Sequence, residues 1–276
     1  MENKIKNLEF LANKIRNHVL DMTSKGSSSH IGSVFSIVDI LACLYGELLS
    51  VSPENIENKN RDRFILSKGH AGAGVYATLA ETGFIEKSLL SSHYQDGSKL
   101  SGHVSHKNIP GVELSTGSLG HGLSVGVGFA MSAKLDNRDN KTVVLLSDGE
   151  CDEGSNWEAI MFSSHHKLDN LIAIIDYNKL QSLDTIENTL NLEPFAEKWK
   201  AFGWHVIEMD GHNIDDITKS YKKALQIKNK PICIIAHTIK GKGVSFFENK
   251  VLWHYRSAKG HEYENAKKEL IYNDLK

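Results

Sequence analysis

The stretch from Thr142 to Gln181 constrains the fold more than any other part of the chain. An apolar run over residues 142–146 is followed by an amphipathic segment and then by a second apolar run over residues 171–175. The amphipathic segment has apolar residues at near-helical spacing, namely Trp157, Ile160, Met161 and Leu168. A short β-rich run, a helix and a second β-rich run in this order predict a βαβ unit, and hence a buried parallel sheet.

Polar residues follow both apolar runs, at the points where the predicted strands end. Asp148 comes after the first run and Asn178 after the second, 30 positions further along. Ligands of parallel α/β sheets bind beyond the carboxyl ends of the strands, where we expect these two side chains to be neighbours. A carboxylate and an amide oxygen, with a backbone carbonyl nearby, suit Mg²⁺, which completes its octahedron with phosphate oxygens and water. The pattern predicts a metal-bridged diphosphate site; the alternative is a Rossmann-like strand end at which Asp148 caps the following helix.

The rest of the chain alternates in a similar way. Helices are predicted over residues 4–23, 34–49, 71–82, 195–203 and 217–227 and from 261 onward, and strands over 63–67, 204–209 and 231–236. With 276 residues, 40% of them hydrophobic, the chain can bury one large core. We therefore expect a single domain over residues 1–276 of class α/β, with three α/β/α layers around a mostly parallel sheet.

Charge, cysteines and the N-terminus narrow the class of protein. The formal net charge is −2, so nothing points to nucleic acid or an anionic membrane as a partner. Cys43, Cys151 and Cys233 are far apart and odd in number, which fits a reducing compartment better than a disulfide framework. The N-terminus lacks the apolar core of a signal peptide, and no apolar run approaches the roughly 18 residues of a membrane span. We expect a cytoplasmic protein.

A second candidate ligand site is the small-residue loop from Gly117 to Gly122. Gly and Ser at the entry of a helix expose N–H donors, which favours anion binding. The loop does not fit the Walker A pattern, and it does not follow a strand as the dinucleotide fingerprint should. Tight helix packing through glycines is an equally good interpretation of the loop. A Rossmann dehydrogenase is disfavoured because the fingerprint is missing.

Five segments, in order, resemble the transketolase family. DGECDEGSNWEA and LDNLIAIIDYNKLQ together resemble its thiamine-diphosphate signature, a Gly-Asp-Gly followed further along by an Asn-containing turn. The other matches are SSSHIG, ILSKGHAGAGVYA, LSGHVSHKNIPGVELSTGSLGHG and HTIKGKGVSFFENKVLWHYR, so the resemblance spans about residues 10 to 260. Two positions depart from the family pattern, because Ser147 stands where Gly is usual and His121 where Gln is usual.

The resemblance implies a metal, a cofactor and a set of site residues. It implies Mg²⁺ held by the side chains of Asp148 and Asn178 and by the backbone carbonyl of Leu180. It implies thiamine diphosphate contacted by His70, Gly117, Ser118, Leu119, Gly149, Glu150, Glu153, Asn178 and His254. Glu153 resembles the family's acid that joins the cofactor sites across a dimer interface. The implied catalytic imidazoles, which titrate near working pH, are His30, His70, His103 and His254.

The resemblance also implies a partner. The family's activating glutamate lies in a pyrimidine-binding domain C-terminal to every matched segment, and this chain stops at Lys276. We therefore expect the N-terminal, diphosphate-binding subunit of a split transketolase, which is silent alone and works with a C-terminal subunit in an α₂β₂ assembly.

The implied reaction transfers a two-carbon ketol unit between sugar phosphates or related sugars. Within the same cofactor class, the alternatives are a 1-deoxyxylulose-phosphate synthase-like protein and a 2-oxo-acid decarboxylase subunit. Outside that class, the alternative is a non-catalytic scaffold subunit that binds Mg²⁺ and a nucleotide.

Overall fold

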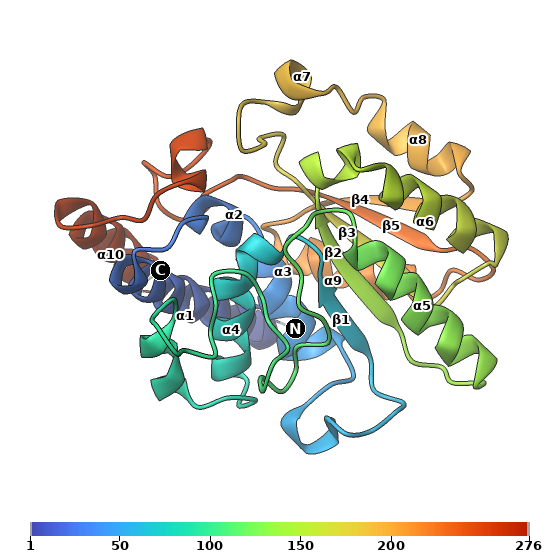
Figure 1. The fold of residues 1–276 in the computed structure, drawn as a ribbon, viewed down its shortest axis with the longest axis horizontal. Coiled ribbons are helices and arrows are strands. Elements are labelled where there is room, and N and C mark those ends of the chain that lie inside the picture. The colour runs from blue at the N-terminus through green and yellow to red at the C-terminus, as the bar shows by residue number, and fades with distance from the viewer. Residues whose placement is uncertain (1, 275–276) are drawn as a thin grey trace.

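The computed structural model describes the backbone of residues 2–274 and is organised around a parallel β-sheet. Its strands are β1 (Arg63–Leu66), β2 (Thr142–Ser147), β3 (Leu171–Tyr177), β4 (His205–Asp210) and β5 (Ile232–His237). They lie in the order β1-β2-β3-β5-β4, and each neighbouring pair is parallel. The prediction of a mostly parallel sheet is confirmed (Figure 1).

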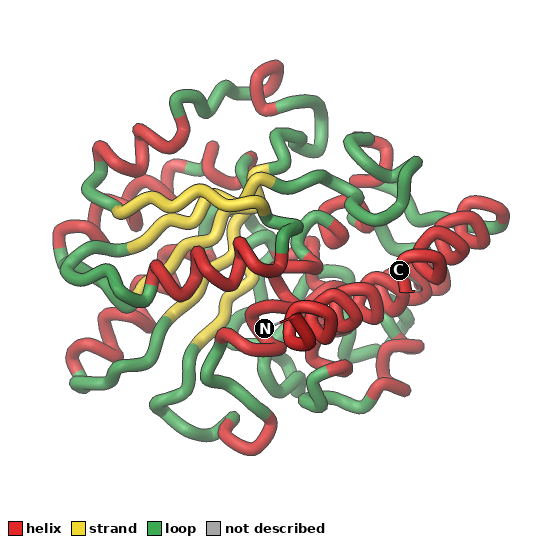
Figure 2. The backbone as a smooth tube through the Cα atoms, turned by 180° about the vertical axis from the view of Figure 1, so that it is seen from behind, coloured by secondary structure: helices red, strands yellow, loops and turns green. Residues whose placement is uncertain are grey.

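Helices cover both faces of the sheet (Figure 2). They are α1 (Glu2–Gly26), α2 (Ile31–Phe35), α3 (Val38–Cys43), α4 (Gly72–Glu81), α5 (Gly122–Leu135), α6 (Gly154–His165), α7 (Ile186–Thr189), α8 (Phe195–Ala201), α9 (Ile214–Ala224) and α10 (His261–Asp274). The segment between α4 and α5 has only a short 3₁₀ helix over Lys87–Ser92 and is otherwise irregular, as predicted for residues 91–116.

Two apolar clusters lie on opposite faces of the sheet. Neighbouring residues of a strand alternate between the faces, so Val143 belongs to one cluster and Val144 to the other. Residues of α1, α3, α4 and α9 complete the first cluster, and residues of α5, α6 and α8 complete the second. The predicted three-layer α/β/α arrangement is therefore confirmed.

A continuous helix over residues 34–49 is wrong. The structure has α2, then α3, then a π-helical turn over Leu44–Leu48. The break falls at Ser36, whose hydroxyl contacts the carbonyl of Ser33 at 2.9 Å and the carboxylate of Asp176 at 2.6 Å. A side chain that competes for such local and tertiary bonds interrupts the helical repeat.

Two further details differ from the sequence pattern. Met161 follows the buried Ile160 on α6 and is 60% exposed, because consecutive helical residues point about 100° apart. The helix predicted from residue 217 begins at Ile214, since the side chain of Asn213 caps it by accepting from the backbone N–H groups of Asp215 and Asp216.

The N-terminal α1 and the C-terminal α10 lie side by side (Figures 1 and 2). The Asn13 side chain on α1 donates to the Leu270 carbonyl on α10 at 2.9 Å, and Lys267 pairs with Asp21 at 2.9 Å. Within residues 2–274, no helix is both long enough and apolar enough to cross a membrane.

Candidate active site

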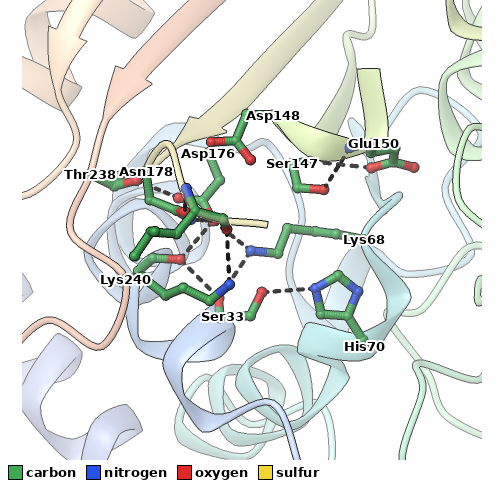
Figure 3. A network of polar contacts seen from close by, with 12 residues as sticks. Ser33, Lys68, His70, Ser147, Asp148, Glu150, Asp176, Asn178, Thr238 and Lys240 are labelled. Atoms are coloured by element: carbon green, nitrogen blue, oxygen red, sulfur yellow. Dashed lines mark hydrogen bonds and ion pairs between the residues drawn. The ribbon is translucent and has the colours of Figure 1, made fainter. Parts of the chain in front are cut away.

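The ends of β2 and β3 bring Asp148 and Asn178 together. The two strands are adjacent, with Ser147 opposite Asp176. The turn after β3 then folds back, so that the backbone N–H of Lys179 donates to Asp148 Oδ2 at 2.6 Å. Figure 3 shows the two side chains at one edge of the sheet, as the sequence predicts.

The donor atoms at this edge fit a hard divalent cation. Asp148 is 1% exposed, and the hydrogen bonds to its carboxylate come from the backbone N–H groups of Gly149 and Lys179. Burial raises the pKa of Asp148 to about 6, and the nearby charge of Asp176 adds to the shift. No ammonium or guanidinium pairs with this carboxylate within residues 2–274. A buried carboxylate beside an amide and a carbonyl oxygen is a donor set that Mg²⁺ completes.

Lys240 lies against the third predicted ligand. Its ammonium donates to the carbonyl oxygens of Leu180 at 2.9 Å and Gln181 at 3.0 Å. Burial lowers the pKa of Lys240 to about 8, and the charge of Lys68 lowers it further. A positive group therefore lies beside the Leu180 carbonyl, where it can contact an anionic ligand.

A cavity opens above these oxygen atoms, with about 490 Å³ of open space. Among the predicted site residues, those that line it are His70, Leu119, Asp148, Gly149, Glu150, Asn178, Leu180 and His254. The predicted residues that do not line it are Gly117, Ser118, Glu153, His30 and His103. The cavity thus combines both predicted ligand sites, the strand ends and the glycine loop.

Four predicted imidazoles form a cluster at the mouth of the site. The ring of His30 lies 4.9 Å from that of His254, 5.1 Å from His70 and 5.7 Å from His103, measured between centroids. Burial lowers the pKa of His30 to about 4 and that of His254 to about 3, and nearby positive groups lower both further. Burial and the charge of Lys68 also hold the pKa of His70 well below its ordinary value. These three rings are neutral at pH 7, so each has one nitrogen that donates and one that accepts.

Two of these rings are held by neighbouring hydroxyls. His70 Nε2 contacts Ser33 Oγ at 2.8 Å, and His30 Nδ1 contacts Ser29 Oγ at 2.8 Å. His254 Nδ1 is buried and has no partner within the described residues. A buried polar atom without a partner at a cavity wall is one that a bound ligand can satisfy.

Glu150 holds the glycine loop against the strand ends. Its carboxylate accepts hydrogen bonds from the backbone N–H of Gly120 at 2.9 Å and of Ser147 at 3.2 Å, and from the hydroxyl of Ser67. The same hydroxyl accepts from the N–H of Gly122 at 3.1 Å, where α5 begins. The carboxylate of Glu150 therefore acts on the backbone that surrounds the cavity.

Glu153 and Gly149 are placed by close packing. Glu153 is exposed and abuts Gly120, where an added Cβ atom would lie 2.7 Å from its own Cβ. At Gly149 an added Cβ would lie 2.8 Å from the side chain of Gln181, which also bonds to Asp152. Gln181 therefore covers the turn that follows β2. The role of Glu153 across a dimer interface stays a prediction.

Three polar residues of the site were not among the predicted ones: Lys68, Asp176 and Lys240. Each follows or ends an apolar strand, where a charged residue signals a buried partner. Lys68 and Asp176 are fully buried and form an ion pair at 2.5 Å. Their partners come from distant segments, so the strand-end pattern could have drawn notice to these residues but could not have paired them.

Comparisons with known proteins agree with this geometry. A family model described as "Transketolase, thiamine diphosphate binding domain" matches residues 8–276. One of the two subunits of the apulose-4-phosphate transketolase of Phocaeicola vulgatus is 42% identical over 267 residues, which are 97% of this chain and 95% of that protein. The 6-deoxy-6-sulfo-D-fructose transketolase subunit SqwG of a Clostridium species is 42% identical over 90% of each chain.

Longer relatives match over part of their length. Human transketolase is 37% identical over 92% of this chain, which spans 40% of the human protein. The crystal structure of transketolase from Campylobacter jejuni superposes with a TM-score of 0.89 at 34% identity, over 95% of this chain and 42% of that one. A Pichia stipitis transketolase complex with sedoheptulose 7-phosphate gives a TM-score of 0.91 at 28% identity, over 98% and 42% of the two chains.

Proposed function

Because the chain belongs to the transketolase family, through its thiamine-diphosphate-binding domain, we propose that it is the cofactor-binding subunit of a two-component transketolase. The observation that carries this proposal is one cavity lined by the oxygen atoms of Asp148, Asn178 and Leu180 and by neutral imidazoles. Residues 1–276 act in this proposal as one diphosphate-binding domain, and the single sheet supports this.

In this proposal, Asp148, Asn178 and the Leu180 carbonyl hold Mg²⁺, and the metal bridges to the diphosphate. Lys240, beside the Leu180 carbonyl, faces the same negative charge. The backbone of the Gly117–Gly122 loop, held by Glu150, approaches the cofactor from the other wall. When bound, thiamine diphosphate supplies the nucleophilic carbon and the electron sink for transfer of a two-carbon ketol unit.

The imidazoles orient the sugar and handle its protons. Neutral His30 and His254 can each donate to one hydroxyl and accept from another, because burial keeps both rings unprotonated. The free Nδ1 of His254 is the atom best placed to exchange a proton or a hydrogen bond with a ligand in the cavity. His70, tied to Ser33, fixes the floor of this cluster.

The partner belongs to the proposal as well. Two relatives that this chain covers over 95% and 90% of their length are named as transketolase subunits, which supports a separate C-terminal subunit carrying the pyrimidine-binding domain. We expect an α₂β₂ assembly with sugar phosphates or related sugars as substrates. The cytoplasmic location stays a prediction.

A titration calorimeter tests the cofactor site. We expect the full chain to bind thiamine diphosphate when Mg²⁺ is present and to lose at least tenfold in affinity when EDTA removes the metal. The Asp148→Ala variant should lose the Mg²⁺-dependent binding, because it removes the only ligand carboxylate.

Asp136→Ala is the matched control, because Asp136 is an exposed carboxylate that pairs with Arg138 far from the cavity. It should bind as the unchanged chain does. Equal, metal-independent binding by the unchanged chain and by Asp148→Ala would contradict the proposed site.

A further inference from the structure

The carboxylate of Asp176, at the end of β3, joins four separate segments of the chain (Figure 3). It is 0% exposed. It accepts hydrogen bonds from Lys68 Nζ at 2.5 Å, Ser36 Oγ at 2.6 Å, Thr238 Oγ1 at 2.5 Å and Asn178 Nδ2 at 3.0 Å. Three of these donors also hold the ends of β1, α2 and β5 in place, whereas the fourth is a residue that lines the cavity.

The bond to Asp176 determines how the Asn178 amide is oriented. An amide has one end that donates and one end that accepts, and only the oxygen end can bind a cation. Asn178 Nδ2 donates to Asp176 Oδ2, so Asn178 Oδ1 faces the opposite way and accepts from the backbone N–H of Leu180 at 3.0 Å. Rotating the amide by 180° would place its oxygen against a buried carboxylate oxygen.

We propose that Asp176, with Lys68 as its counter-ion, is the positioning residue that aims the oxygen of Asn178 at the cation. Resting on the proposed function, this assigns a task to two buried residues that lie outside the cavity. It also explains why an amide stands at position 178, since a carboxylate there would place two carboxylate oxygens about as close as the 3.0 Å contact between residues 176 and 178.

Lys68 makes this arrangement possible. Its ammonium is 0% exposed and contacts only Asp176 Oδ2 and the carbonyl of Ser33 among the described residues. A buried carboxylate needs such a partner, and removal of either charge alone leaves the other uncompensated. Variants that test orientation must therefore remove both charges together.

The test compares two double variants of the full chain, Lys68→Met with Asp176→Asn and Lys68→Met with Asp176→Leu. Both remove the buried ion pair and keep side chains of similar size. Only the first keeps an oxygen at position 176 that accepts from Asn178 Nδ2. Calorimetry with thiamine diphosphate and Mg²⁺ should show at least tenfold tighter binding for the Asn variant than for the Leu variant. Equal affinities for the two variants, with equal thermal midpoints, would overturn the proposal.

The side-chain amide itself gives a readout that needs no metal. In the apo chain labelled with ¹⁵N-asparagine, the Asn178 NH₂ signals, assigned by their loss in Asn178→Asp, should exchange slowly with solvent. The protection should persist in the Asn double variant and disappear in the Leu one. Unprotected signals in the unchanged chain would overturn the positioning role, even where thiamine diphosphate binds. Failure of the unchanged chain to bind the cofactor, with the amide protected, would count against the proposed function alone.

The single variant Asn178→Asp separates orientation from charge. If the cation site responded only to negative charge, an added carboxylate would strengthen Mg²⁺ binding. We expect at least tenfold weaker Mg²⁺-dependent binding, because the new carboxylate faces Asp176 instead of donating to it. Tighter binding by Asn178→Asp would overturn the inference.

Discussion

Burial decides which ionisable side chains of this chain carry charge at neutral pH. The imidazoles of His30, His70 and His254 are neutral because water is excluded from them and lysines lie nearby. Histidines were predicted at these positions from the sequence, but their protonation states were not, because these depend on Lys68 and Lys240, which reach the site from other strand ends. A motif gives the chemical group, whereas the fold sets its charge.

His93 tests the cost of a buried imidazole away from the cavity. It is 2% exposed, and burial lowers its pKa to about 4. Because the folded-state pKa lies below that of the unfolded chain, protons bind the unfolded chain more tightly. The stability that His93 contributes is full above about pH 6.5 and is lost as the pH falls toward 4, by up to roughly 3 kcal/mol.

Replacing His93 by Phe should therefore change the pH dependence of unfolding. The free energy of unfolding of the unchanged chain, minus that of His93→Phe, should fall as the pH goes from 7 to 4.5, measured by urea denaturation. Leu90→Ala removes buried apolar surface beside His93 and no ionisable group, so its effect should be the same at each pH. A difference for His93→Phe that does not vary with pH would contradict the assignment.

At the scale of helices and strands, close contacts explain where small residues are needed. α5 crosses the sheet at Gly126, where an added Cβ would lie 2.4 Å from Val144 on β2. Gly128 is two residues further along the same helix, and an added Cβ there meets nothing within 4 Å. The sequence shows both glycines as equal members of one small-residue run. Only the packing of α5 on β2 distinguishes them.

The two glycines should respond to alanine in opposite ways. Gly126→Ala should destabilise the chain by about 1–3 kcal/mol, because the methyl group overlaps a buried side chain. Gly128→Ala should stabilise it by about 0.5–1 kcal/mol, because alanine favours the helix. Thermal and urea unfolding of the two variants would show this, and destabilisation of both to the same extent would mean that the packing of α5 differs from the structure.

At the scale of the whole molecule, the sequence predicts strand identity well and strand order poorly. β2, β3 and β5 are apolar throughout and buried on both faces, so each is clearly predicted as an inner strand. β4 alternates between buried and exposed residues, which is typical of its edge position. The placement of β5 between β3 and β4 depends on chain crossovers that no local pattern encodes. For the same reason the ends of β2 and β3 could be matched from the sequence, but not their contacts with Lys240.

The assembled protein should be active only with its partner. The purified chain alone should show no ketol transfer from a ketose phosphate to an aldehyde acceptor in a coupled assay, and addition of the C-terminal subunit should raise the rate at least 100-fold. The reason is that the cofactor's activating carboxylate is proposed to lie on the partner. EDTA should abolish the restored activity. Turnover by the chain alone, free of contaminants, would contradict this, and turnover of pyruvate would favour the 2-oxo-acid enzymes.

The four donors to Asp176 also set a timetable for synthesis of the protein. Ser36 and Lys68 leave the ribosome early, but Thr238 follows Ser36 by roughly 200 positions, which takes about 10–40 seconds at typical elongation rates. Until then the carboxylate and the ammonium of the ion pair lack part of their final surroundings, and β5 cannot enter the sheet beside β3. A nascent chain therefore completes its cation site near the end of translation, so the cofactor meets a chain whose sheet has already closed.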